Sequence, residues 1–217
     1  YKTLLNQFQK SLRFRNALLS KKPSQYLAQI KASDEQFAKV NIELLERKKL
    51  LISEIVLPIN ETFKSIFSME HELDLKVDSA LSGMNVNAVL KLWSERLEND
   101  VLRGHTTRGV HKDDYVLLFD GMNAFEYCSL GQQKMAYLSL LFAYITLFRY
   151  KFSSFPIVLI DDVSGELDRF RWQNLVAHLK ESKFQVFITT ANENFKMELL
   201  NHLDDAKHME VCNGKII

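Results

Sequence analysis

Two short apolar stretches constrain the fold of this chain most strongly. One runs from Ile157 to Ile160 and the other from Gln185 to Thr189, and a helical pattern from Asp168 to Ser182 separates them. The first stretch is apolar throughout, which is typical of a strand in a sheet covered on both faces. Chains in which strands alternate with helices build α/β folds. The sequence therefore predicts an α/β body with parallel-type core strands.

Other periodicities predict the remaining elements of this body. Leu73, Leu75 and Val77 alternate with charged residues, as in a half-buried strand. The pair Asn213-Gly214, between two apolar stretches, is a strong hairpin signal. We also expect a helix at Asn87–Val101, a strand at Tyr115–Phe119 and an apolar helix that begins at Ser129 and ends near Tyr150.

The first third of the chain has a helical pattern. Apolar residues recur at helical spacing from Tyr1 to about Leu19, where Lys21-Lys22-Pro23 ends the pattern. A second helix is expected to begin with Ser33 as its cap and to end near Pro58. Two long helices joined by a break predict an antiparallel helical hairpin arm. The expected division is an arm over residues 1–67 and a head lobe over residues 68–217.

Composition excludes several classes of protein. The chain is 47% hydrophobic and 25% charged, as ordinary soluble proteins are. No apolar run reaches the roughly 18 residues of a membrane span. Cys128 and Cys212 make no metal or disulfide pattern, which favours the reducing cytoplasm. The chain does not begin with Met, so we expect that it starts inside a longer protein.

The apolar strand from Ile157 ends in two adjacent carboxylates, Asp161 and Asp162. Ligands of open α/β sheets bind at the carboxyl ends of strands. One carboxylate at such a position can hold Mg²⁺, and the other can polarise an attacking water. Many strands also end in Asp because a turn or a helix cap follows, so the pair alone leaves both interpretations open.

Two further motifs flank this strand. Ser129–Gln133, with the sequence S-L-G-Q-Q, stands at the start of an apolar helix, where a hydroxyl, a glycine and a helix N-terminus together suit an anion. Ser164–Asp168, with the sequence S-G-E-L-D, precedes the next helix. The structural alternatives are a capped core helix for the first motif and an N-cap role for Asp168.

The order of these motifs resembles that of ABC-type ATPases, and most closely that of the RecF family. Ser129–Gln133 is similar to the ABC signature motif, and Ser164–Asp168 to the D-loop with one extra glycine. Gly109–Asp114 resembles the G-P-H-R-D-D segment of the family, with Val110 and Lys112 as departures. The R-N-A-L-L run from Arg15 to Leu19 is similar to part of the family's lever arm. No G-x-x-x-x-G-K-[ST] phosphate loop occurs in the 217 residues, so the resemblance is to the C-terminal portion of the family.

The resemblance implies a composite nucleotide site with ATP and Mg²⁺ as cofactors of the intact parent protein. Asp161 would hold Mg²⁺ as the Walker B residue, and Asp162 would be the catalytic carboxylate. The remaining implied nucleotide-contacting residues are Ser129, Gly131, Gln132, Gln133, Asp168 and Thr190. An ATP-dependent homodimer would then clamp DNA at gaps or single-strand/double-strand junctions, with RecO and RecR as partners and recombinase loading as the outcome. The parent would be a slow DNA-dependent ATPase, whereas the present chain alone would neither hydrolyse ATP nor bind it tightly.

Basic residues are concentrated near the N-terminus. Residues 1–50 hold 11 Lys and Arg against 4 Asp and Glu. Such an excess favours contact with nucleic acid or is simply a solvated helix face. The candidate DNA-binding residues are Lys10, Arg13, Arg15, Lys48 and Lys49.

Two other functions remain open from the sequence. The chain would be a non-enzymatic module that binds protein or DNA, or it would belong to another SMC-like repair ATPase such as RecN. The coiled coil of the latter would be longer than the roughly 60 residues of the arm, by the length of sustained heptads.

Overall fold

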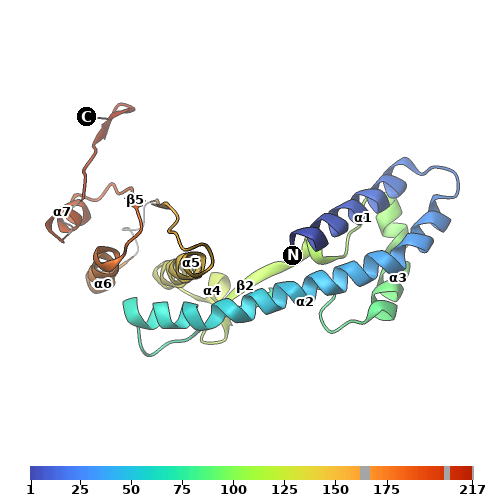
Figure 1. Cartoon of the computed structure of the whole chain (residues 1–217), viewed down its shortest axis with the longest axis horizontal. Coiled ribbons are helices and arrows are strands. Elements are labelled where there is room, and N and C mark those ends of the chain that lie inside the picture. Colours follow the sequence, from blue (N-terminus) through green and yellow to red (C-terminus); the bar gives the residue numbers. More distant parts are fainter. Residues whose placement is uncertain (162–166, 203–205, 217) are drawn as a thin grey trace. The chain divides into compact units, whose positions relative to one another are not determined.

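The structure, a computed structural model, describes residues 1–161, 167–202 and 206–216. The chain folds as two compact units, each built from two segments of the sequence (Figure 1). The first unit is Tyr1–Glu54 with Leu75–Val116, and the second is Ile55–Asp74 with Leu117–Ile217. The functional division at residue 67 into arm and head remains a prediction.

Three helices build the core of the first unit. They are α1 (Lys2–Lys21), the first part of α2 (Tyr26–Ile66) and α3 (Val86–Arg103). Phe8 of α1 stacks on Phe37 with ring centroids 5.7 Å apart, and Phe37 stacks on Trp93 at 4.8 Å. Further along α1, Arg15 contacts Asp34, which precedes Phe37 in α2. Later residues of α1 therefore pack against earlier residues of α2. The expected antiparallel hairpin of helices is therefore present, and α3 packs against it.

Helix α2 is longer than the sequence pattern predicts. It begins at Tyr26 rather than at a cap on Ser33, whose hydroxyl instead donates within the helix to the Ile30 carbonyl at 3.1 Å. The helix also passes through Pro58 and ends at Ile66. Both expected ends were wrong. The helix continues past the proline because Ile59, Phe63 and Ile66 are buried, and that burial offsets the hydrogen bond that proline cannot make.

A three-stranded sheet follows in the order β1-β2-β3. Its strands are β1 (Leu73–Asp78), β2 (Asp114–Phe119) and β3 (Met122–Asn123). Strands β2 and β3 are antiparallel and pair Phe119 with Met122. The two residues between them, Asp120 and Gly121, have φ angles of 49° and 80°, as the turns favoured in two-residue hairpins require.

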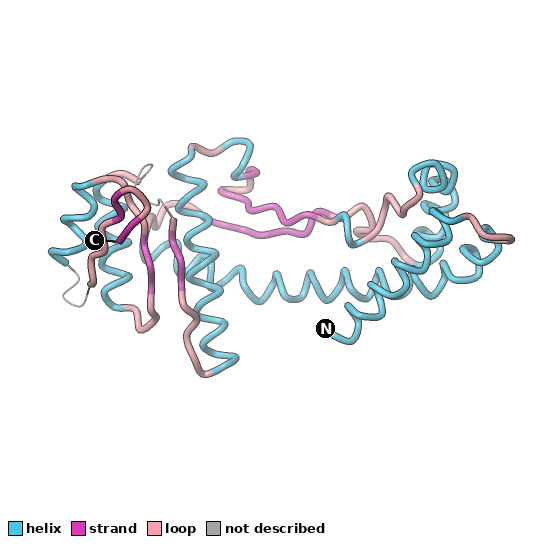
Figure 2. Tube along the Cα trace, turned by 90° about the horizontal axis from the view of Figure 1, so that it is seen from above, coloured by secondary structure: helices cyan, strands magenta, loops and turns pink. Residues whose placement is uncertain are grey.

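The second unit contains a parallel pair of strands among helices (Figure 2). After α4 (Ala124–Tyr127) and α5 (Leu130–Phe152) come β4 (Val158–Ile160), α6 (Arg169–Glu181), β5 (Val186–Ile188) and α7 (Glu193–His202). Val158 pairs with Val186, and Ile160 with Ile188. The predicted α/β class and its parallel strands are confirmed. Within the described residues, no helix combines the length and hydropathy that crossing a membrane demands.

The expected burial of β4 on both faces was wrong. Val158 and Ile160 are buried, but Leu159 between them is 75% exposed. On the neighbouring strand, Phe187 is 42% exposed. This alternation is that of a strand pair with one covered face, and an apolar sequence alone does not distinguish it from a strand covered on both.

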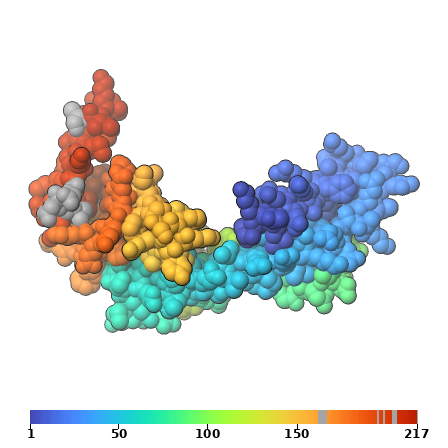
Figure 3. All heavy atoms as spheres, in the orientation of Figure 1, coloured from blue at the N-terminus to red at the C-terminus, as the bar shows by residue number. Residues whose placement is uncertain are grey.

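The chain ends in the hairpin that its sequence predicts. Strands β6 (Val211–Cys212) and β7 (Lys215–Ile216) are antiparallel, and Asn213 and Gly214 form the turn with φ angles of 51° and 76°. The described residues of this hairpin, red in Figure 3, are all exposed.

Candidate functional site

A hydrogen bond between two side chains connects the carboxyl ends of β4 and β5. Asp161 follows β4 directly and is exposed to solvent. The Thr189 hydroxyl, one residue after β5, donates a hydrogen bond to the Asp161 carboxylate. The Thr189 amide also donates to the Ile160 carbonyl at 3.0 Å, which extends the pairing of the two strands. The Asp161 carboxylate is thus held at the edge of the sheet where α/β proteins bind ligands.

These two side chains fit part of a magnesium site. A carboxylate and a hydroxyl supply the hard oxygen atoms that Mg²⁺ prefers. In the part of the chain that the structure describes, no three His, Cys, Asp or Glu side chains are close enough together to hold a metal ion. A Mg²⁺ ion bound with a nucleotide needs only one or two protein carboxylates, because phosphates and waters complete its shell. Asp162, the expected catalytic carboxylate, lies outside the described residues.

Thr190, which the family pattern implies at the switch position, has a local role in the structure. Its hydroxyl accepts a hydrogen bond from the Asn192 amide at 3.1 Å. The side chain that reaches Asp161 is that of Thr189, which sequence reasoning missed. Two adjacent threonines at a strand end offer no sequence signal for which of them faces the neighbouring strand.

The S-L-G-Q-Q motif forms the first turn of α5. The Ser129 hydroxyl accepts a hydrogen bond from the Gln132 amide at 3.3 Å, and the Gln132 side chain accepts one from the Ser129 amide at 2.9 Å. The Gln133 side chain donates to the Cys128 carbonyl at 2.9 Å. This reciprocal capping box satisfies two helix donors and fixes the start of α5. The exposed N-terminus of a 23-residue helix also attracts anions, so capping and anion binding are compatible here.

Asp168 caps the N-terminus of α6. Its carboxylate accepts hydrogen bonds from the Arg171 amide at 2.9 Å and from the Arg171 guanidinium at 2.6 Å. The capping alternative is therefore confirmed. The preceding residues of the D-loop pattern, 164–166, lie outside the described residues, and the D-loop role of Asp168 stays a prediction.

Arg15 is not available to DNA, which corrects one of the expected contacts. Its side chain is 1% exposed and donates from Nε to Asp34 at 2.9 Å and from Nη1 to Asp100 at 2.8 Å. The same Nη1 donates to the Thr106 hydroxyl at 2.8 Å. Burial raises the pKa of Asp34 above its ordinary value, and the neighbouring Arg15 charge opposes that shift. The guanidinium thus joins all three helices of the first unit rather than facing solvent.

Lys48 is the second expected DNA contact that has a structural role. Its ammonium donates to the Val110 carbonyl at 2.7 Å and to Asp113 at 2.9 Å. Lys49 pairs with Glu46 on the same helix face at 2.9 Å. Lys10 and Arg13 are exposed on α1. The basic candidates therefore reduce to Lys10, Arg13 and Lys49.

The segment that resembles G-P-H-R-D-D is packed on α2. Gly109 has a φ of 156°, and a Cβ there would lie 3.0 Å from the Asn41 side-chain oxygen. That oxygen, on a fully buried residue, accepts a hydrogen bond from the Val110 amide at 3.1 Å. The His111 Nε2 donates to the Thr106 carbonyl at 3.0 Å, and burial lowers the pKa of this imidazole. The segment therefore has a structural role in the first unit, and Lys112 is exposed.

Comparisons with known proteins agree with the RecF resemblance. The chain is 34% identical to "DNA replication and repair protein RecF" of Alkaliphilus oremlandii over 221 residues, which is 98% of the chain and 59% of that protein. It is 31% identical to the RecF of Heliobacterium modesticaldum over 88% of the chain and 54% of the relative. For the RecF of a Geobacter species, the identity is 30% over 100% of the chain and 60% of the relative. The chain thus spans little more than half the length of these relatives.

Solved structures share the fold. A structure described as the recombination mediator protein RecF-ATP in the RecFOR pathway aligns with a TM-score of 0.69 at 23% identity, over 89% of this chain and 54% of the other. A second RecF structure aligns with a TM-score of 0.70 at 20% identity, over the whole chain and 58% of the other. No family model matches the chain. The expected family is confirmed, and neither the RecN alternative nor the non-enzymatic one is favoured.

Proposed function

We propose that this chain, whose sequence and fold are those of the RecF family, supplies part of the composite ATP site of a DNA replication and repair protein. The observation that carries the proposal is the exposed Asp161 carboxylate at the carboxyl edge of a parallel strand pair, oriented by the Thr189 hydroxyl. The signature-like turn at Ser129 lies in the same unit. The proposal includes a cytoplasmic location for the protein.

Within that site, each residue would have the role that its side-chain chemistry allows. Asp161, with Thr189 beside it, would hold Mg²⁺, which supplies charge stabilisation to a transferring phosphoryl group when bound. Asp162 would orient or activate water. Ser129, Gly131 and Gln132, at the N-terminus of α5, would bind the γ-phosphate of ATP held by a second copy of the protein, with Gln133 beside them. Asp168 would lie at the dimer interface, and Thr190 near the switch position.

The proposed partners follow from the same family. ATP-driven dimers would clamp DNA at gaps or junctions, and proteins of the RecO and RecR kinds would take part in loading a recombinase. The exposed cations Lys10 and Arg13, with the half-buried Lys49, would contact DNA phosphates through charge alone.

The 217 residues alone are expected to bind ATP poorly, because a triphosphate is held mainly by the amides and lysine of a phosphate loop, which the sequence does not contain. Isothermal calorimetry with Mg-ATP should show no binding at micromolar concentration. A micromolar dissociation constant for the chain alone would contradict this expectation.

The function itself is tested in a longer protein that contains this chain. The coding sequence upstream of Tyr1 is expected to encode G-x-x-x-x-G-K-[ST] between a strand and a helix. In that protein, Asp161→Asn should lower ATP turnover at least about 100-fold, since a metal-held charge contributes several kcal/mol. Ser129→Arg should abolish ATP-driven dimerisation, measured by light scattering, while ATP binding to the monomer changes less than about twofold. A parent without a phosphate loop, or Ser129→Arg dimers that form normally, would overturn the proposal.

A further inference from the structure

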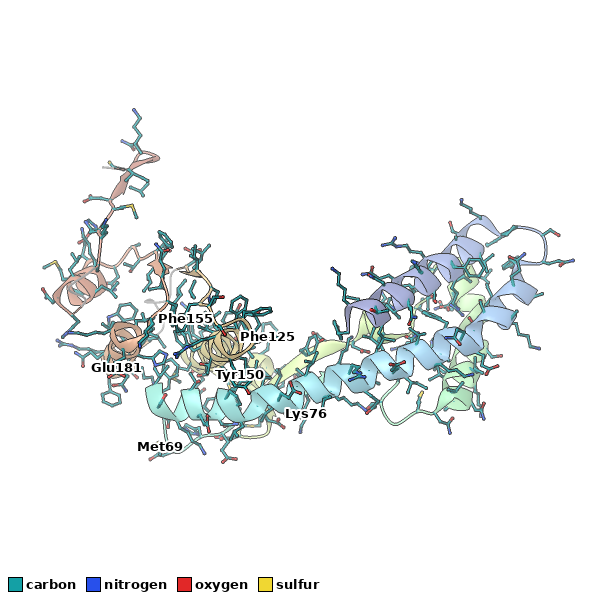
Figure 4. The ribbon with its side chains drawn as sticks, in the orientation of Figure 1. Met69, Lys76, Phe125, Tyr150, Phe155 and Glu181 are labelled. Carbon is teal, nitrogen blue, oxygen red and sulfur yellow. The ribbon has the colours of Figure 1, made fainter. Side chains whose placement is uncertain are left out.

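A cavity in the second unit lies at the end of the strands opposite to Asp161. Its lining comes from the second half of α5, the loop before β4, the end of α6 and the loop before β5. Phe155 and Glu181, labelled in Figure 4, represent two of these segments. Because β4 and β5 are parallel, the cavity is at their amino ends and the proposed ATP site is at their carboxyl ends. The cavity is therefore separate from the nucleotide motifs.

Aromatic side chains form the walls of this cavity. Phe142 of α5 lies 4.8 Å from the His178 ring and 6.1 Å from the Phe184 ring, measured between centroids. Phe155 lies 6.4 Å from the same Phe184 ring. Burial lowers the pKa of His178, so its ring lines the cavity as a neutral aromatic near pH 7. The four rings offer a surface that suits another apolar or aromatic group.

The rim of the cavity carries more positive than negative charge. The Arg149 guanidinium lies over the Phe155 ring, 4.9 Å from its centroid, and Lys183 of the same lining is exposed. Glu181 is the single carboxylate of the lining. Among the described residues, no ion pair within 4.0 Å engages Arg149 or Lys183, so both cations are free to meet an incoming carboxylate.

The size of the cavity limits what it can hold. Its volume is about 200 Å³. Small-molecule sites in proteins measure roughly 300–1,000 Å³, so this cavity is smaller than the sites that enclose a nucleotide or a cofactor. The cavity is large enough for one large side chain of a protein partner. Buried aromatic side chains of this size are the anchors that dominate protein interfaces.

We propose that this cavity is a docking site for a protein partner that inserts one aromatic or large aliphatic side chain flanked by carboxylates. The apolar side chain would lie between Phe142, Phe155 and Phe184, and the flanking carboxylates would meet Arg149 and Lys183. Because the site is at the amino ends of the strands, a partner bound there leaves Asp161 and Ser129 accessible. The inference goes beyond the proposed ATP site and does not depend on it.

The first test compares three short peptides by isothermal calorimetry with the 217-residue chain. The probe is a capped hexapeptide with one phenylalanine between aspartates, and the two controls replace the phenylalanine by alanine or the aspartates by lysines. We expect the probe to bind with a dissociation constant below about 100 µM. Loss of the aromatic anchor should weaken binding about 30-fold, and reversal of the flanking charges about tenfold.

Two variants of the chain locate the binding. Arg149→Glu should weaken the acidic peptide about tenfold and strengthen the lysine-flanked one, since it reverses the charge of the rim. Thr146→Trp adds an indole to the cavity wall and should abolish binding of every peptide. Lys215→Glu, on the exposed terminal hairpin of the same unit, makes the same charge change elsewhere and should leave binding within about twofold. Far-UV circular dichroism and the thermal midpoint establish whether each variant is folded. If the Thr146→Trp chain does not fold, the Arg149→Glu variant alone tests where the peptide binds.

Several outcomes would overturn the proposal. No detectable binding of the acidic peptide at about 1 mM would do so, as would equal binding of the lysine-flanked peptide. If Arg149→Glu left the preference for the acidic over the lysine-flanked peptide unchanged, the peptides would be binding to another surface. A chain that sediments as a dimer and becomes monomeric with Thr146→Trp would show that the occupant is a second copy rather than an acidic partner.

Discussion

At the scale of single residues, the first unit is organised around a charge that the sequence suggested was on the surface. Arg15 stands in a basic stretch of α1, but it lies three residues after Leu12 and four before Leu19, on the apolar face of the helix, whereas Arg13 lies on the exposed face. Only the fold brings Asp34 and Asp100, distant in sequence, to its two donor faces. A buried ion pair adds little net stability over apolar packing, but removal of one partner leaves charge unpaired. This asymmetry makes Arg15 a sensitive position.

Arg15→Met should lower the free energy of unfolding of the chain by about 3–5 kcal/mol, because it leaves two carboxylates with reduced compensation in the interior. Urea denaturation followed by circular dichroism measures the change. Arg13→Met on the exposed face of the same helix is the matched control and should change stability by less than about 0.5 kcal/mol. Equal effects of the two substitutions would contradict the structural role of Arg15.

His111 gives the stability of the chain a pH dependence of definite sign. Burial lowers its pKa in the folded state below the ordinary value of 6.5. The unfolded chain therefore takes up a proton below about pH 6.5 that the folded chain does not, and stability falls as the pH is lowered through that range. His111→Gln should reduce this fall in urea denaturation between pH 7.5 and 5.5, whereas His208→Gln, at an exposed position, should leave it unchanged. His178 shifts in the same direction, so part of the dependence remains.

At the scale of elements, sequence periodicity predicted most helices and strands but not their limits. The strand pair, the helix from Ser129 and the terminal hairpin follow from spacing and turn residues, which act locally. The course of α2 through Pro58 depends on burial of Ile59, Phe63 and Ile66 in the second unit, which is a tertiary effect. The choice of Thr189 over Thr190 at the site and the open face of β4 are also tertiary, since they depend on which side of a strand is covered.

Pro58→Ala should stabilise the second unit. The substitution restores a backbone donor within α2 and removes a ring that clashes with the preceding turn, which together cost about 3 kcal/mol in an unconstrained helix. Because α2 already accommodates the proline, the expected gain is about 1–3 kcal/mol in urea denaturation. Ser53→Ala, an exposed substitution one turn earlier in α2, should change stability by less than about 0.5 kcal/mol. A loss of stability with Pro58→Ala would mean that the proline relieves strain in this helix.

At the scale of the whole molecule, the candidate DNA-binding cations of the first unit should determine how binding to DNA depends on salt. For duplex DNA, each phosphate neutralised by the protein contributes about 0.9 to the slope of log affinity against log salt. Replacement of Lys10, Arg13 and Lys49 by alanine should therefore lower that slope by about 2–3, measured by fluorescence anisotropy with a labelled duplex. The control replaces Lys207 and Lys215, exposed in the second unit, and should leave the slope unchanged. Equal slopes for the triple variant and the unmodified chain would exclude these cations of α1 and α2 as a DNA-binding surface.

The open face of β4 and β5 has a practical consequence for anyone who handles this chain. Leu159 and Phe187 present apolar groups to water on adjacent strands, and such surfaces attract one another more strongly as a solution is warmed or supplied with sulfate. Freshly purified samples therefore keep best when cold, dilute and free of precipitating salts. Turbidity that rises on gentle warming, while circular dichroism is unchanged, would be association of folded molecules rather than denaturation.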